Sequence, residues 1–122
     1  MKETVVLLHG LGRRSASMAK LKRDLEGQGF EAVSWGYPSR RRRLAGHIDA
    51  LRSWLTEQAF DGPVHFVGHS LGGIIIRGAL ATDPPVTVGR IVMIAVPNQG
   101  AGIVSHFGSW PLSQLFFGLP LE

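Results

Sequence analysis

The pentapeptide Gly68–Gly72, with the sequence Gly-His-Ser-Leu-Gly, has the residue types and spacing of a nucleophilic serine on a sharp turn. An apolar run, Val64–Val67, precedes it and a helix-compatible run follows it, which is the strand, turn and helix context that a G-x-S-x-G motif needs. The backbone of such a turn is crowded, so the residues two positions either side of the serine must lack a Cβ. Gly68 and Gly72 meet this requirement. The sequence therefore predicts Ser70 as a nucleophile at the carboxyl end of a strand.

Two backbone N–H groups are candidates for stabilising an oxyanion next to Ser70. The N–H of Leu71 lies at the predicted helix N-terminus, where the helix dipole favours negative charge. The second candidate comes from the loop His9–Gly12, which follows the first predicted strand. If that strand is the neighbour of the strand before Ser70, the carboxyl ends of the two strands lie side by side at the point where the strand order of the sheet reverses, which is where open α/β sheets bind ligands. The N–H of Leu11 is then the predicted second donor.

Apolar runs of strand length alternate along the chain with runs of helical periodicity. This alternation, with short links, predicts right-handed crossovers and a parallel sheet covered by helices. We expect a single domain over residues 1–122, a three-layer α/β/α fold with a mostly parallel sheet of about four strands in the order 2-1-3-4, and a last strand buried on both faces. The expected strands are Thr4–His9, Phe30–Trp35, Val64–Gly68 and Arg90–Val96, and the expected helices are Met18–Gln28, Leu44–Ala59 and Leu71–Thr82.

Four segments in this order resemble the α/β-hydrolase superfamily, and in particular small bacterial esterases and lipases. They are Val6–Gly12, Gly36–Ser39, Gly68–Gly73 and Val96–Gly100. The resemblance implies acyl transfer through an acyl-serine intermediate on a small-molecule ester or lipid, without a metal or other cofactor. We also expect a pocket wall or part of a lid to be formed by the apolar tail residues Trp110, Leu112, Phe116 and Phe117.

The chain departs from the superfamily pattern after the serine. The superfamily order is serine, acid, histidine, but only Asp83, Glu122 and His106 are available after Ser70. Asp83 ends the helix that Ser70 begins, roughly 18 Å away at 1.5 Å per residue, and Glu122 is the last residue. We expect the chain to correspond to the amino-terminal two-thirds of a hydrolase domain, with activity much reduced. His106 is the candidate surrogate base, and the alternative for it is a surface or packing role.

Two other functional classes stay open from the sequence. The first is a catalytically dead hydrolase fold used for binding or assembly, which the missing acid and base favour. The second is a nucleotide-binding module, because Gly10-x-Gly12-x-x-Ser15 approximates the dinucleotide fingerprint. Position 15 is neither glycine nor alanine, and the next strand ends in Trp35-Gly36-Tyr37 instead of an acid for the ribose. This second alternative is therefore the weaker one.

Composition excludes several classes of protein. With 44% hydrophobic and 18% charged residues among 122, the chain is expected to be globular. It has no cysteine, and therefore no disulfide or thiolate metal site. The net charge is +4, and Arg40–Arg43 is interpreted as a solvated loop and not a nucleic-acid site, since no aromatic residues interleave for base stacking. No signal peptide or transmembrane segment is recognised, which predicts a cytoplasmic location.

The remaining histidines are expected to have structural roles. His65 and His69 lie four residues apart on a strand, about 13 Å, which is too far for a metal pair. His69 is expected to point away from the Ser70 hydroxyl, and His47 is expected on a helix surface.

The last predicted strand is a candidate association surface. Ile91–Ala95 would form an apolar edge with unpaired backbone groups, and the tail Trp110–Leu119 adds apolar surface. We expect self-association, ahead of pairing with a complementing fragment or folding of the tail over the sheet. The tail lacks the alternating pattern needed to replace a strand.

Overall fold

The computed structural model describes residues 3–10, 18–38, 43–94 and 119–120. Every strand and helix expected from the sequence is present, with ends shifted by a few residues. None of the helices in the described segments is long and apolar enough to cross a membrane, and a cytoplasmic location stays a prediction. The elements are β1 Thr4–Leu8, α1 Ala19–Gly27, β2 Glu31–Trp35, α2 Leu44–Glu57, β3 Val64–His69, α3 Leu71–Leu80, β4 Val88–Ile94 and β5 Leu119–Pro120.

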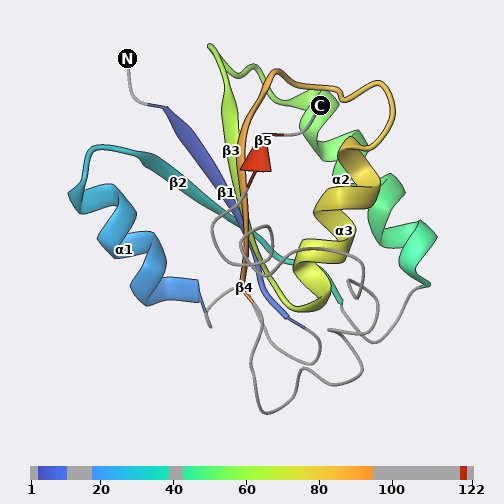
Figure 1. The fold of residues 1–122 in the computed structure, drawn as a ribbon, viewed down its shortest axis with the longest axis horizontal. Helices are drawn as coiled ribbons and strands as arrows, with labels where there is room; N and C mark the ends of the chain where they lie inside the picture. Colours follow the sequence, from blue (N-terminus) through green and yellow to red (C-terminus); the bar gives the residue numbers. More distant parts are fainter. Residues whose placement is uncertain (1–2, 11–17, 39–42, 95–118, 121–122) are drawn as a thin grey trace.

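The sheet has the order β2-β1-β3-β4-β5, and its first four strands are parallel, which confirms the predicted order 2-1-3-4. Within it, Leu8 at the end of β1 is in register with Trp35 on β2 and Gly68 on β3. The carboxyl ends of these three strands therefore meet at one edge of the sheet (Figure 1). Loops that carry chemistry in open α/β sheets are expected at this edge.

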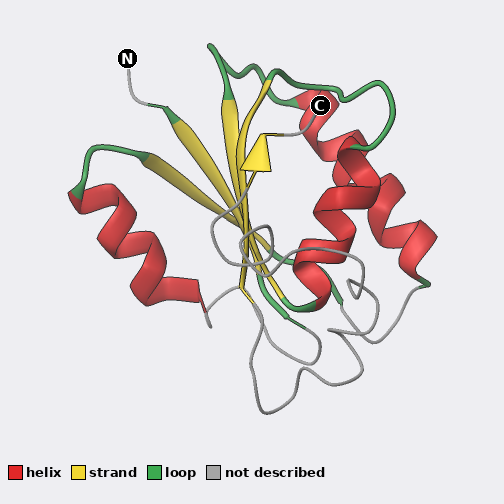
Figure 2. Ribbon diagram, viewed as in Figure 1, coloured by secondary structure: helices red, strands yellow, loops and turns green. Residues whose placement is uncertain are grey.

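Helices cover the sheet on both faces, with α1 on one side and α2 and α3 on the other (Figure 2). The larger core lies under α2 and α3, where Ile75, Ile76, Ala79 and Leu80 of α3 are fully buried. Their spacing follows the helical period, so that one face of α3 is apolar. The smaller core lies under α1, which contributes only partly buried leucines.

β4 is not buried on both faces, contrary to the sequence prediction. Ile91 and Met93 are buried on the side of α2 and α3, whereas Val92 is partly buried and Ile94 is 36% exposed. The reason is the position of α1, whose main sheet contacts are with the opposite edge strand β2. The continuous apolar sequence of β4 is typical of a strand buried on both faces, but in the structure the face that carries Val92 and Ile94 is only partly covered.

The tail supplies a short fifth strand that the sequence did not predict. In β5, Leu119 pairs with Ile91 and Pro120 with Arg90, both antiparallel to β4. A two-residue bridge needs no alternating pattern, and proline is tolerated at a sheet edge because its missing N–H can face outward. The pairing covers Ile91, the first residue of the edge Ile91–Ala95 that we expected to be unpaired, and Arg90 directly before it.

The carboxyl end of α3 is held by a side chain from α2. The Arg52 guanidinium donates to the carbonyl oxygens of Ala79 at 2.7 Å, Thr82 at 3.0 Å and Asp83 at 3.0 Å. These carbonyls lack partners within the helix, and a cation there also complements the helix dipole. Because Ser70 precedes the other end of the same helix, Arg52 anchors the element that follows the candidate nucleophile.

We expect Arg52→Ala to lower the free energy of unfolding by about 2 kcal/mol, the typical value for hydrogen bonds to a charged group. Arg23→Ala is the matched control, because Arg23 is exposed on α1 and surface substitutions usually change stability by no more than about 0.5 kcal/mol. Urea unfolding of both variants measures the difference. Equal midpoints would show that this contact does not stabilise α3.

Candidate active site around Ser70

Ser70 lies on the turn between β3 and α3 with φ 59° and ψ −120°. A non-glycine residue at positive φ costs about 1–3 kcal/mol and persists only where its surroundings hold it. Here Ser70 N donates to the Ile94 carbonyl at 2.9 Å, and Ser70 O accepts from Gly73 N at 2.9 Å. The side chain makes no capping hydrogen bond to the helix that it precedes. The turn therefore presents the hydroxyl without using it to cap α3.

The two glycines that flank Ser70 lie where side chains do not fit. A Cβ on Gly68 would lie 2.5 Å from both the N and the Cα of Gly73. A Cβ on Gly72 would lie 2.6 Å from the carbonyl oxygen of Leu8 and 2.8 Å from that of His9. All of these atoms are backbone, so nothing can rotate away. The crowding that the sequence motif implies is present in the structure.

The loop after β1 lies directly against this turn. A Cβ on Gly10 would lie 2.7 Å from Nδ1 of His69 and 3.2 Å from Cβ of Ser70. Leu71 is the first residue of α3, and N–H groups in the first turn of a helix have no partner within the helix. Leu11, the other predicted donor, lies outside the described residues, as do His106 and Glu122. The predicted pocket or lid residues Trp110, Leu112, Phe116 and Phe117 lie outside them too.

Asp83 lies beyond the far end of α3 from Ser70, as the helix length required. It is exposed, has φ 49°, and its carbonyl accepts a hydrogen bond from Arg52. It is also the only acid in the described segment from Leu71 to Ile94, which contains no histidine. That part of the chain therefore supplies neither a triad acid nor a base next to Ser70.

Tyr37 and His9 form a buried pair that the sequence analysis did not single out. The Tyr37 hydroxyl donates to the His9 carbonyl at 2.7 Å, and Tyr37 N lies 3.3 Å from Nε2 of His9. The two rings stack with centroids 4.2 Å apart. They follow the adjacent strands β2 and β1, so the pair ties together two loops at the carboxyl edge. The only sequence signal was their place directly after two neighbouring strands.

His47 was expected at the surface but is only 1% exposed. Its ring meets Tyr37 edge-on at a centroid distance of 4.9 Å. Together with Leu51 and Leu55 it occupies positions four residues apart on α2, which fall on one face of a helix, and this face packs on the sheet. The i, i+4, i+8 spacing with Leu51 and Leu55 was the sequence signal from which its burial could have been predicted.

His65 has a structural role at the other end of the sheet. Its Nδ1 accepts a hydrogen bond from Arg90 N at 2.9 Å, and its Nε2 lies 3.4 Å from a Glu3 carboxylate oxygen. Because Nδ1 accepts from a backbone N–H, the neutral ring carries its proton on Nε2, facing Glu3. His65 therefore links β1, β3 and β4 close to their amino ends.

Tyr37 gives the protein a specific response to alkaline pH. Burial raises the pKa of the Tyr37 phenol well above its ordinary value of about 10. A pKa raised by folding contributes stability that is full below the unfolded pKa and is lost as the pH rises through the folded pKa. Tyr37 is the only tyrosine, so tyrosinate absorbance reports on it alone. We expect that absorbance to appear above about pH 10 and together with unfolding; a midpoint near 10 in a still-folded protein would contradict the burial.

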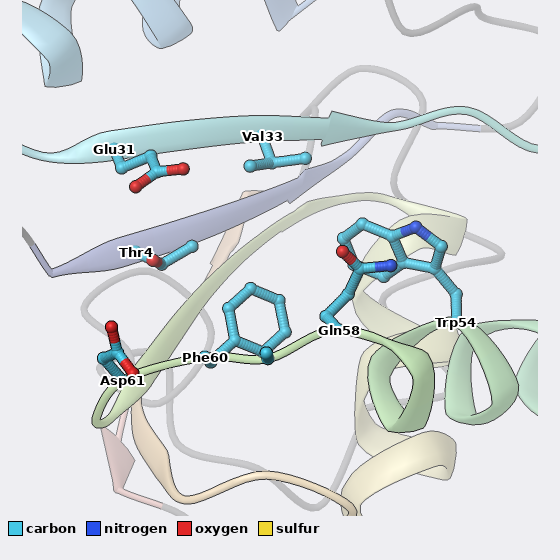
Figure 3. Close-up of a pocket in the computed structure, with 8 residues that line it drawn as sticks. Thr4, Glu31, Val33, Trp54, Gln58, Phe60 and Asp61 are labelled. Carbon is cyan, nitrogen blue, oxygen red and sulfur yellow. The ribbon is translucent and has the colours of Figure 1, made fainter.

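Two cavities in the described part of the chain lie away from Ser70. One, of about 270 Å³, has Thr4, Glu31 and Asp61 at one end and Trp54 and Gln58 at the other (Figure 3). The other, of about 340 Å³, lies under α1, between Leu25 and Phe30 on one side and Val92 of β4 on the other. The first is lined by the opening residues of β1 and β2, at the amino edge of the sheet. Neither is lined by residues of the Ser70 turn.

Comparisons with known proteins agree with this geometry. The chain is similar to the solved structure of the ydeN gene product from B. subtilis, with a TM-score of 0.62 and 24% identity over 75% of this chain. It is similar to polyneuridine aldehyde esterase, with a TM-score of 0.62 and 22% identity over 93% of this chain. It is also similar to tomato methylketone synthase I, with a TM-score of 0.61 and 21% identity over 94% of this chain. It spans 50% of the length of each of them. A search of curated proteins found no match. Residues 5–121 match the alpha/beta hydrolase family, so a single family assignment covers nearly all of the sequence. The protein belongs to the alpha/beta hydrolase family.

Proposed function

We propose that this chain carries the nucleophilic part of a serine hydrolase that cleaves carboxylic esters. Ser70 Oγ attacks the ester carbonyl carbon, and the alcohol leaves with the hydroxyl proton. Water then attacks the acyl-serine, which releases the carboxylic acid and restores the hydroxyl. The N–H groups of Leu71 and Leu11 stabilise the negative oxygen formed in each step. His106 is the proposed surrogate base.

The observation that carries this proposal is the backbone conformation of Ser70. A φ of 59° at a serine is strained, and the flanking glycines are needed because Cβ atoms at their positions would strike backbone. Such strain gathers at functional sites, where it aims a reactive group. Membership of the alpha/beta hydrolase family supports the same chemistry.

The expected substrates are esters with apolar acyl chains, because the sequence places aromatic and aliphatic residues in its carboxyl-terminal tail. Turnover by this chain is expected to be slow, because a surrogate base activates a serine less well than the base of a complete triad. A series of p-nitrophenyl esters from acetate to octanoate tests the proposal. We expect the protein to release p-nitrophenol faster from the longer esters than from the shorter ones. Unfolding the protein in guanidinium should abolish its acceleration of ester cleavage. Equal rates with folded and unfolded protein would contradict the proposal.

We also propose that the chain self-associates through the Ile91–Ala95 edge and the Trp110–Leu119 tail. In support, Ile94 is 36% exposed, and within the described part of the chain the pairing on the outer side of β4 covers only Arg90 and Ile91. Soluble proteins generally avoid an open apolar edge of this kind. Sedimentation velocity at micromolar concentration should give a dimer or larger species, and Ile94→Lys should shift it toward monomer. A wild-type protein that sediments as a monomer at all concentrations would refute the proposal.

A further inference from the structure

We propose that the cavity at the amino edge of the sheet, where β1 and β2 begin, is a binding site for a primary alkylammonium ion. The cavity has a volume of about 270 Å³. Sites for drug-sized ligands typically measure roughly 300–1,000 Å³, so the ligand that fits here is smaller than those. Ser70 follows β3 at the opposite, carboxyl edge, and this inference is therefore independent of the proposed function.

The first observation is the charge of the cavity wall. Glu31, at the start of β2, and Asp61, in the link between α2 and β3, both line the cavity. The lining residues that the structure describes include no lysine, arginine or histidine. Because the chain as a whole has a net charge of +4, the cavity is a locally negative site on a positively charged protein. Charge complementarity therefore favours a cation as its occupant.

The second observation is that three acceptor groups at one end of the cavity are available to a ligand. Thr4 and Glu31 are opposite each other in the register of β1 and β2, and Asp61 lies at the same end of the cavity (Figure 3). With the rest of the described chain, these three side chains form no ion pair and no hydrogen bond. A primary ammonium group has three N–H donors, which matches one hydroxyl and two carboxylates.

The third observation is the aromatic part of the wall. Figure 3 shows the Phe60 ring between the acidic end of the cavity and the end that carries Gln58 and Trp54. The rings of Phe60 and Trp54 meet edge-on with centroids 6.2 Å apart. An aromatic ring attracts a cation and also gives an alkyl chain an apolar surface. A short alkyl chain that lies along Phe60 therefore has its charged end at the carboxylates and its apolar end at Trp54.

An inorganic ion suits this cavity less well than an organic one. Ca²⁺ takes roughly six to eight oxygen ligands. Among the described residues there is no group of three or more His, Cys, Asp or Glu side chains that could hold a metal ion. Phe60, Val33 and Trp54 offer a metal ion no ligand atom, whereas they give an alkyl chain its contact surface. The wall as a whole therefore fits an ammonium group with a short alkyl chain.

The test compares three probes that share a butyl chain. n-Butylammonium has the positive charge and three N–H donors, butyltrimethylammonium has the charge alone, and n-butanol has no charge. Each probe is titrated into the isotope-labelled wild-type protein at low ionic strength. The indole N–H of Trp54, identified by its loss in Trp54→Phe, and the backbone N–H groups of Phe60 and Asp61 report on occupancy of the cavity by their NMR shifts.

We expect n-butylammonium to bind with a Kd of about 1 mM, a value within reach of a ligand with so few atoms. The other two probes should bind at least about 10-fold more weakly, because charge-assisted hydrogen bonds contribute more than charge or apolar contact alone. Ser70→Ala should bind n-butylammonium as tightly as the wild type.

Matched variants locate the binding. Glu31→Gln and Asp61→Asn each remove one charge and keep the shape of the side chain. Glu26→Gln and Asp49→Asn make the same changes at exposed positions on α1 and α2 that do not line the cavity. We expect each cavity variant to weaken n-butylammonium binding about fivefold, the upper end for an ion pair open to solvent, and the double variant about 20-fold. The two controls should bind as the wild type does.

Several outcomes would overturn the inference. Equal affinities for n-butylammonium and n-butanol would show that the cavity selects only an alkyl chain. Tighter binding of butyltrimethylammonium would show that the aromatic rings, and not the oxygen atoms, select the ligand. No shift at Trp54, Phe60 or Asp61 with any probe would leave the carboxylates as charges that keep an edge strand from pairing. The probe comparison uses the wild-type protein, so it decides even if a variant fails to fold.

Discussion

Ser70→Ala is expected to reduce ester cleavage to the buffer rate and to remove fluorophosphonate labelling completely. Oγ is the atom that forms the covalent bond in both reactions, so no neighbouring group can substitute for it. The fold should survive, because the Ser70 side chain makes no capping bond and the turn is held by its backbone contacts with Ile94 and Gly73. Initial rates and intact mass measure the two effects.

The matched control for this substitution is Ser53→Ala, which removes an exposed serine from α2. It should leave both rates and labelling unchanged. If Ser70→Ala cleaves p-nitrophenyl esters at the wild-type rate, Ser70 is not the nucleophile. Circular dichroism and thermal unfolding of each variant show whether any loss has a structural cause.

Gly72→Ala is expected to lower the free energy of unfolding by about 3 kcal/mol or more and to abolish labelling, an effect at the upper end of what overpacking costs. The new Cβ would lie 2.6 Å from the Leu8 carbonyl oxygen and 2.8 Å from that of His9. Relief requires α3 to move away from β1, which would carry Ser70 away from the loop after β1. Guanidinium unfolding and a labelling time course measure the two effects.

Gly27→Ala is the control for Gly72→Ala. Gly27 is the last residue of α1, and a Cβ there would meet no heavy atom within 4 Å. Alanine in a helix is favoured over glycine, so this variant should gain about 0.5 kcal/mol or stay unchanged. If Gly72→Ala is as stable as Gly27→Ala, the tight contact between α3 and β1 is not as we describe it.

The sheet order could be predicted from local sequence patterns together with the rule that crossovers between parallel strands are right-handed. The loop after β1 lies beside Ser70 if β1 and β3 are neighbours in the sheet. The two strands are neighbours, since Leu8 of β1 pairs with Gly68 of β3. The glycine spacing likewise reflects a steric requirement that does not depend on distant parts of the chain. These features could be predicted because each depends on a few nearby residues.

Features that depend on distant contacts were missed or wrong. The exposure of Ile94 depends on where α1 lies, and the short strand β5 depends on a tail far along the sequence. The Tyr37 contact with His9 joins residues 28 positions apart. Nothing in the local pattern around either residue encodes that pairing. The roles proposed for Leu11 and His106, which lie outside the described residues, stay predictions.

Mapping the site of fluorophosphonate modification on the wild-type chain tests the central claim most directly. We expect a single adduct per chain, located on Ser70 by peptide mass spectrometry and formed only while the protein is folded. The other serines should stay unmodified, because none of them lies on the turn that aims Ser70 at the loop after β1. A folded protein with no adduct, or with its adduct on a different serine, would contradict the account.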